Sequence, residues 1–137
     1  MSAAGGARGR VLIVDDNAPI RELAELIAKG AGWDADEAPG GREALAMLAQ
    51  RHYDCVLLDI AMPDVSGEDV FLAIRRDPIL ARMRVVAYTA NAMTHEVARY
   101  KALGFDAIVA KPATIQELRA ALSGPVNGAA ALPERCI

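Results

Sequence analysis

Residues 11–17 read Val-Leu-Ile-Val-Asp-Asp-Asn, four apolar residues followed at once by two carboxylates and an amide. A short run without polar residues is typical of a strand buried on both faces of a parallel sheet. Asn17 is a suitable N-cap for a helix, and Pro19 suits its first turn. The stretch therefore predicts a buried strand that passes directly into a helix, with Asp15 and Asp16 between them.

The same pattern recurs along the chain. Further strands are expected at 34–38, which is only weakly apolar, and at 55–58, 85–88 and 107–110. The segments between and after the strands carry apolar residues at helical spacings; these sets are Ile20, Leu23, Ala24 and Ile27, then Leu45, Leu48 and Ala49, then Phe71 and Ile74, and finally Ile115, Leu118 and Leu122. Such βα units, with strands too far apart for hairpins, predict an α/β fold with a five-stranded parallel sheet and helices on both faces.

Capping residues predict where several helices begin and end. Two pairs have the spacing of a capping box; they are Ser66 with Asp69, and Thr114 with Glu117. Glycines follow three helical segments, where a left-handed residue commonly ends a helix; they are Gly30, Gly104 and Gly124. These signals place the helix boundaries between the predicted strands.

The totals suit one domain of moderate charge. Of 137 residues, 53% are hydrophobic and 24% are charged, and the formal net charge is −3. Lysines and arginines do not cluster, which argues against a nucleic-acid-binding surface. No apolar stretch approaches the roughly 18 residues that a membrane span requires. The absence of an apolar signal core and of a disulfide framework favours a cytoplasmic protein. We expect a domain over 10–123, a flexible N-terminal segment over 1–9 and a C-terminal tail over 124–137.

Polar side chains follow four of the five predicted strands. Asp15 and Asp16 follow the first, Asp59 the third, Thr89 the fourth and Lys111 the fifth. Parallel strands bring their carboxyl ends to one edge, where open α/β sheets bind ligands. Several carboxylates with open positions for water and phosphate suit Mg²⁺. A carboxylate beside such a metal can attack phosphorus, while the lysine and the threonine stabilise the transferring group. The pattern therefore indicates phosphoryl transfer to a carboxylate.

Four motifs, in this order, resemble those of bacterial response-regulator receiver domains. They are residues 11–17, residues 56–67 (VLLDIAMPDVSG), Tyr88-Thr-Ala90 and Ala110-Lys-Pro112. The resemblance extends from about Arg10 to Ser123. It implies a flavodoxin-like, doubly wound, three-layer (βα)5 sandwich. It also implies a two-component or phosphorelay signalling protein of the stand-alone type, which catalyses only its own phosphorylation and dephosphorylation and is otherwise no enzyme.

The resemblance further implies a role for each residue at this edge. Asp59 would accept the phosphoryl group, and Lys111 would pair with Asp59 and then with the phosphoryl oxygens. Thr89 would turn inward to hydrogen-bond the phosphate, and the Lys111–Pro112 peptide bond would be cis. Mg²⁺ would be bound by Asp16 directly and by Asp15 directly or through water. Asp59 and the backbone carbonyl of Ala61 would be the further ligands.

The implied phosphoryl donor is a sensor histidine kinase or a histidine phosphotransfer protein, and the signal would pass to a downstream protein target by direct contact. Receiver domains often carry Tyr or Phe three residues before the lysine, and this chain has Ile108 there. We therefore expect a switch through Thr89 and the helix that follows it. The expected switch and partner surface comprises Thr89, Val97, Tyr100, Lys101 and Ile108.

Other interpretations stay open. The chain could be a receiver fragment of a hybrid histidine kinase, because residues 90–93 (ANAM) resemble those proteins. An aspartyl-nucleophile phosphohydrolase is a rival from another class, although such enzymes usually carry a second Asp where this chain has Ala61. A receiver that binds partners without phosphorylation is disfavoured by the presence of Asp16, Asp59 and Lys111. Taken alone, the acidic pair after the first strand could be a simple helix cap.

Overall fold

The computed structural model describes residues 9–90, 93–111 and 113–122. Within these residues, strands β1 (Arg10–Val14), β2 (Asp34–Ala38), β3 (Cys55–Asp59), β4 (Arg84–Thr89) and β5 (Ala107–Ala110) alternate with helices α1 (Ala18–Gly30), α2 (Gly41–Gln50), α3 (Gly67–Arg76), α4 (Thr94–Leu103) and α5 (Ile115–Leu122). The expected tail, most of the N-terminal segment and Pro112, with its expected cis bond, lie outside the described residues.

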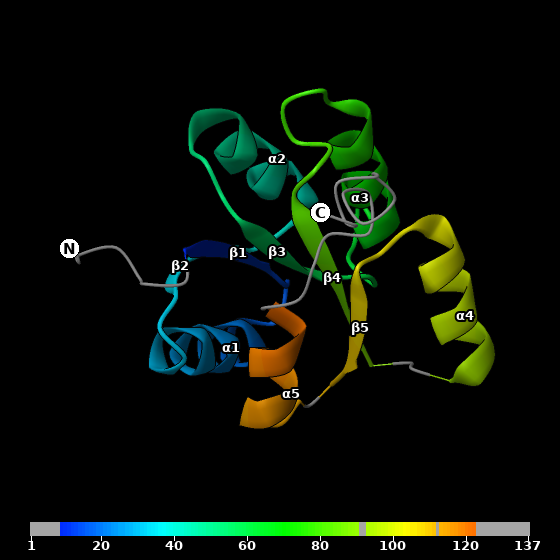
Figure 1. Cartoon of the computed structure of the whole chain (residues 1–137). Helices are drawn as coiled ribbons and strands as arrows, with labels where there is room; N and C mark the ends of the chain where they lie inside the picture. The colour runs from blue at the N-terminus through cyan, green and yellow to red at the C-terminus, as the bar shows by residue number, and fades with distance from the viewer. Residues whose placement is uncertain (1–8, 91–92, 112, 123–137) are drawn as a thin grey trace, which may run out of the picture.

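The strands form one parallel sheet in the order β2-β1-β3-β4-β5. Helices α1 and α5 cover one face, and α2, α3 and α4 lie on the other (Figure 1). This confirms the predicted five-stranded α/β sandwich of flavodoxin-like topology. The strand order reverses between β1 and β3, and in open sheets such a reversal opens a crevice at the carboxyl ends.

The apolar composition of the strands follows from their place in the sheet. Strands β1, β3 and β4 are central, and nearly all of their residues are buried. Strand β2 is an edge strand, with only two of its five residues buried, which accounts for its weak apolar character. Phe71 and Phe105 stack at 4.1 Å between their ring centroids in the core beneath α3, and Trp33 lies in the core beneath α1.

The predicted helix starts are confirmed. Asn17 caps α1 by accepting a hydrogen bond from the Ile20 amide at 3.1 Å. Both capping boxes form with their reciprocal hydrogen bonds, Ser66 with Asp69 and Thr114 with Glu117. Side chains thereby satisfy amides that have no partner inside their own helix.

Some predicted helix ends and faces are wrong. Gly104 ends α4 in the left-handed conformation, as expected, but α1 includes Gly30, and the residue with positive φ is Gly32. Helix α1 packs on the sheet through Ala24 and Ala28, because short side chains let its backbone approach the strands closely. Leu23 of the same helix is therefore 51% exposed, and two further side chains predicted on buried faces, Ala49 of α2 and Ile115 of α5, are also exposed.

An ion pair joins α3 to the N-terminal ends of β4 and β5. Arg75 Nη2 lies 2.9 Å from Asp106 Oδ2, and this oxygen also accepts the Val85 amide at 2.7 Å. Arg75 Nη1 donates to the carbonyls of Ala81 and Met83 at 3.2 and 2.7 Å. The Asp106 side chain is fully buried. The pair therefore connects a helix with two strands at the edge opposite the acidic residues.

No helix in the described ranges is both long and apolar enough to cross a membrane.

Candidate functional site

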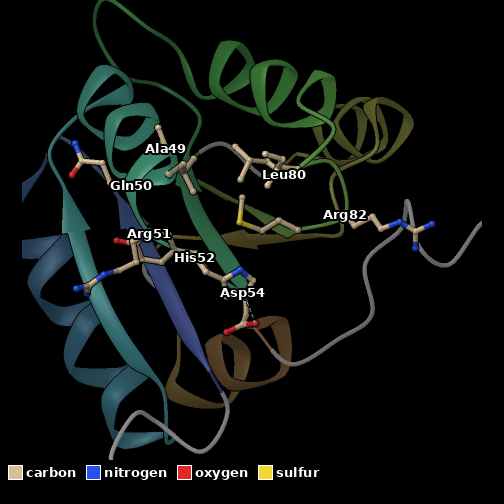
Figure 2. Close-up of a pocket in the computed structure, with 11 residues that line it drawn as sticks. Ala49, Gln50, Arg51, His52, Asp54, Leu80 and Arg82 are labelled. Atoms are coloured by element: carbon tan, nitrogen blue, oxygen red, sulfur yellow. Dashed lines mark hydrogen bonds and ion pairs between the residues drawn. The ribbon is translucent and has the colours of Figure 1, made fainter.

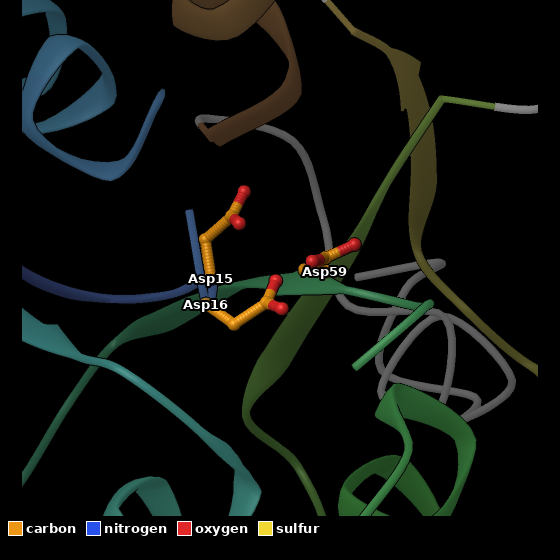
Figure 3. A group of neighbouring side chains, drawn as sticks. All are labelled: Asp15, Asp16 and Asp59. Carbon is orange, nitrogen blue, oxygen red and sulfur yellow. The ribbon is translucent and has the colours of Figure 1, made fainter. Parts of the chain in front are cut away.

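Carboxylates from β1 and β3 meet at one edge of the sheet. Val14 and Leu58 are register partners in neighbouring parallel strands, so the residues that follow them, Asp15 and Asp59, come side by side. Asp15 and Asp59 are 0% and 3% exposed, whereas Asp16 is exposed. One oxygen of each of the three carboxylates lies within 4.8 Å of the others (Figure 3). The structure thus brings together the three acidic residues predicted from sequence.

The Lys111 side chain reaches this carboxylate cluster from the end of β5. Its Nζ lies 2.7 Å from Asp15 Oδ2 and 3.1 Å from Asp59 Oδ1, and the side chain is 11% exposed. Burial alone would lower the pKa of Lys111, but hydrogen bonds and charge attraction from Asp15 and Asp59 outweigh burial and raise that pKa. The lysine is therefore an ammonium ion that partly neutralises the carboxylates.

Thr89 and Ala61 lie beside the same cluster. Thr89 is buried at the end of β4, and its backbone carbonyl accepts the Lys111 amide at 2.8 Å. Ala61 is two residues beyond Asp59, and its backbone amide donates to Asp59 Oδ1 at 3.2 Å. All the residues predicted for the phosphorylation site are therefore grouped at the carboxyl ends of β1, β3, β4 and β5.

The cluster carries more negative charge than its surroundings readily accommodate. Burial, followed by repulsion from Asp15, raises the pKa of Asp59 to about 6, against the opposing effects of Lys111 and the Ala61 amide. Among the described residues, the buried Asp15 Oδ2 has the Lys111 ammonium, 2.7 Å away, as its one partner. Both observations fit a divalent cation with oxygen ligands. Because Asp16 is exposed to solvent, water molecules have room to bind the same cation.

The raised pKa of Asp59 predicts a pH-dependent response to Mg²⁺. The native state binds the Asp59 proton more tightly than the unfolded chain does, so this carboxyl favours the native state at low pH. That contribution is lost as the pH rises from the unfolded pKa toward about 6. Because protons and metal compete for the same oxygen atoms, MgCl₂ should raise the melting temperature clearly near pH 7.5, and far less near about pH 5. Thermal melts with Mg²⁺ or EDTA test this, and equal shifts at both pH values would contradict it.

Sequence reasoning missed a residue that supports Asp15. Arg21 Nη1 donates to the Asp15 backbone carbonyl at 2.8 Å, and Arg21 Nε lies 2.7 Å from Glu37 Oε1 at the end of β2. The Asn17 amide donates to Asp15 Oδ1 at 2.9 Å. The turn that carries the acidic pair is therefore fixed by α1 and β2 together. No spacing rule marks Arg21, because its partners belong to two other elements.

Gly67 brings the first turn of α3 against the backbone of Asp59. The Gly67 amide donates to the Ile60 carbonyl at 3.0 Å. A Cβ on residue 67 would overlap the Asp59 carbonyl oxygen and the Ile60 Cα, neither of which can move independently of the site. Glycine is therefore required here by close approach.

Gly67→Ala should destabilise the fold by about 2–4 kcal/mol, because the added methyl group displaces the Asp59 backbone. Urea unfolding monitored by circular dichroism measures this. Gly30→Ala is the matched control, since a Cβ there meets nothing within 4 Å; it should be neutral or stabilising by about 0.5–1 kcal/mol. Equal losses in the two variants would show that close approach at Gly67 is not the cause.

The expected partner surface is only partly exposed. Lys101 is exposed, and Val97 and Ile108 are half-buried beside a groove of about 520 Å³ between α4, β5 and α5. Tyr100, expected on this surface, is 5% exposed, because its ring packs edge-on against Phe105 with 5.9 Å between centroids. We correct that expectation: Tyr100 anchors α4 to the core and offers little surface to a partner.

Another groove, of about 440 Å³, lies between the α2–β3 and α3–β4 connections (Figure 2). Its lining includes Arg51, Tyr53, Ile79 and Arg82, and no residue of the carboxylate cluster. It is formed by residues that precede β3 and β4, at the edge of the sheet opposite the acidic residues. This groove is therefore separate from the carboxylate cluster.

The buried Asp59 thus shares the Lys111 ammonium with Asp15, and Asp16 lies beside them, at the switch point of a doubly wound sheet. The chain belongs to the response regulator receiver domain family, whose model matches residues 11–123. Receiver domains of this family are signalling phosphoacceptors of bacterial two-component systems.

Among curated proteins, the chain is 32% identical over 105 residues to the polar-differentiation response regulator DivK of Brucella ovis, covering 77% of this chain and 85% of DivK. It is 32% identical to the phosphate regulon transcriptional regulatory protein PhoB of Pseudomonas aeruginosa, covering 82% of this chain and 49% of PhoB. It is 35% identical to the sensor histidine kinase AruS of the same organism, covering 82% of this chain and 11% of AruS. The chain thus spans about half or less of some relatives.

Solved structures agree with this assignment. The chemotaxis protein CheY4 of Vibrio cholerae superimposes with a TM-score of 0.75 at 28% identity, covering 82% of this chain and 93% of CheY4. A sensor protein from Polaromonas sp. JS666 gives a TM-score of 0.80 at 28% identity, covering 88% of this chain and 98% of that protein.

Proposed function

We propose that the protein is a phosphorylation-dependent switch that accepts a phosphoryl group on Asp59 in a Mg²⁺-dependent reaction and signals by protein–protein contact. The observation that carries the proposal is the buried Asp59 carboxylate, which has the Lys111 ammonium at 3.1 Å and the carboxylates of Asp15 and Asp16 beside it. This combines a nucleophile, a fixed positive charge and a set of metal ligands on one open edge.

The proposed reaction transfers a phosphoryl group from a phosphohistidine. An Asp59 oxygen forms a bond to phosphorus as the P–N bond breaks, and the electron pair of that bond stays on the imidazole nitrogen. Asp59 Oδ1 is already held by Lys111 and the Ala61 amide, so we assign the attack to Oδ2. Bound Mg²⁺ would supply positive charge against the phosphoryl oxygens.

The chain's own residues would share the remaining work. Lys111 would form an ion pair with the phosphoryl oxygens during the transfer. The Thr89 hydroxyl would donate a hydrogen bond to them afterward. The carboxylates of Asp15, Asp16 and Asp59 and the carbonyl of Ala61 would bind the metal. The burial of Asp59 and Lys111 supports the role proposed for the lysine. A fixed charge in a site shielded from water stabilises a transition state more than a charge surrounded by water does.

We further propose a sensor histidine kinase or a histidine phosphotransfer protein as donor, a downstream protein as target, a cytoplasmic location, and a domain over 10–123 flanked by segments 1–9 and 124–137. The likeness to a sensor histidine kinase supports this type of partner. It also favours a second candidate, that these residues are the receiver portion of a hybrid kinase. Phosphotransfer assays with the adjacent kinase domain, if one is encoded, would distinguish the two.

The test is incubation with acetyl phosphate, a small phosphoryl donor, followed by intact-mass measurement under mild conditions. We expect one added phosphoryl group with Mg²⁺ and none with EDTA. Asp59→Asn keeps the side-chain shape and should gain none under either condition. Equal gain with EDTA would overturn the metal dependence, and equal gain in Asp59→Asn would overturn the assigned acceptor.

A further inference from the structure

Tyr88 precedes Thr89 on β4 and contacts several parts of the phosphorylation site. The Lys111 Nζ lies 5.2 Å from the centroid of the Tyr88 ring. Tyr88 is 4% exposed, so its ring meets the lysine in a region shielded from water. The Tyr88 carbonyl accepts the amide of Ile60, the residue after Asp59, at 3.3 Å. A single residue therefore touches the connections that carry the phosphoacceptor and its lysine.

The position of Tyr88 in the sheet explains these contacts. Tyr88 is the register partner of Asp59 on one side and of Val109 on the other. Its side chain is buried on the α1–α5 face, where it packs with Val109 and Leu118. The ring thus lies between the strand that carries Asp59 and the strand that leads to Lys111.

We propose that Tyr88 is a positioning residue, which holds the Lys111 ammonium over the carboxylate cluster through its ring. The inference rests on the proposed phosphorylation of Asp59 and deepens it. A lysine has a flexible four-carbon stem, so its ammonium needs fixed contacts to stay in one place. An aromatic face attracts a cation, and the attraction increases where water is excluded.

An ordinary core role for Tyr88 predicts something different. A buried ring that only fills space would change stability when shortened, with no specific link to Lys111. A positioning role predicts that the effect on the phosphorylation rate depends on the presence of the lysine. Coupling between the two residues therefore separates the alternatives.

The experiment compares Tyr88→Phe, which keeps an aromatic ring, with Tyr88→Leu, which removes the ring. Rates of phosphorylation by acetyl phosphate with saturating Mg²⁺ should stay within about threefold of wild type in Tyr88→Phe and fall about 10- to 30-fold in Tyr88→Leu. Tyr53→Phe is the matched control, because Tyr53 is a buried tyrosine whose hydroxyl donates to Asp36 at 2.6 Å away from the site. Its rate should not change.

The same substitutions are then made in a Lys111→Met background. Tyr88→Leu should cause no further loss there, because the group that it positions is already absent. Equal losses in both backgrounds would overturn the positioning role and leave Tyr88 as core. If Tyr88→Leu does not fold, Tyr88→Met takes its place, since it keeps a long apolar side chain without the ring.

A second readout does not depend on phosphorylation. The Tyr88 ring should displace the NMR signals of the Lys111 Hε protons by its ring current, and Tyr88→Leu should return them to ordinary lysine positions. Unchanged Lys111 signals would overturn the inference even if Asp59 is phosphorylated. Displaced signals in a wild-type protein that takes up no phosphoryl group would instead refute the proposed function and leave the placement of Lys111 by Tyr88 standing.

Discussion

Replacing Lys111 with methionine should slow phosphorylation of Asp59 by about 100- to 1,000-fold while tightening the binding of Mg²⁺. The two effects have one origin. The ammonium lies 2.7 Å from Asp15 Oδ2 and 3.1 Å from Asp59 Oδ1, so it competes with a cation for the same oxygens. Without it, the carboxylates attract the metal more strongly, but the transferring group loses its fixed positive charge.

Rates come from intact-mass time courses with acetyl phosphate, and Mg²⁺ affinity comes from the change in melting temperature with MgCl₂ concentration. Lys29→Met is the control, because Lys29 is an exposed lysine in the last turn of α1, paired only with Glu25 among the described residues. It should change neither quantity. Weaker Mg²⁺ binding in Lys111→Met would contradict the competition between ammonium and metal.

Asp106→Ala should destabilise the fold by about 3–4 kcal/mol, the second large effect that we expect. The Asp106 side chain is fully buried and holds both Arg75 and the Val85 amide. Its removal leaves a partly buried guanidinium and a backbone donor without this partner, and that cost exceeds the value of the pair itself. The phosphorylation site lies at the other edge, so the folded variant should still take up phosphate.

Urea unfolding at neutral pH measures this loss. Arg51→Gln is the control, because Arg51 pairs with Asp36 while its side chain is 54% exposed. Exposed ion pairs contribute little, so this variant should lose less than about 1 kcal/mol. If Asp106→Ala lost no more than the control, the Arg75–Asp106 pair would not be a main connection between α3 and the sheet.

The sheet and the grouping of the site residues could be predicted because both follow from strand ends. Runs of apolar residues identified the central strands, and parallel pairing necessarily brings Asp15, Asp59 and Lys111 to one edge. The weak strand at 34–38 was also predicted correctly, by its place in the alternation of strands and helices. These features depend on residue type and order, which the sequence contains directly.

The rest depends on packing, which one sequence does not contain. The face that α1 buries is set by how closely alanines approach the sheet, so Leu23 is exposed against expectation. Tyr100 is buried because it packs edge-on against Phe105 and joins the core cluster that holds Phe71 of α3. The contacts of Arg21 with Asp15 and of Tyr88 with Lys111 likewise join separate elements. No local pattern indicates them.

The central claim is that Asp59, and neither of its acidic neighbours, carries the phosphoryl group. Borohydride reduces an acyl phosphate to an alcohol, so a phosphorylated aspartate becomes homoserine, which peptide mass spectrometry locates. After treatment with acetyl phosphate and Mg²⁺, we predict homoserine at position 59 and intact aspartate at positions 15 and 16. Homoserine at Asp15 or Asp16 with Asp59 unmodified would contradict the account.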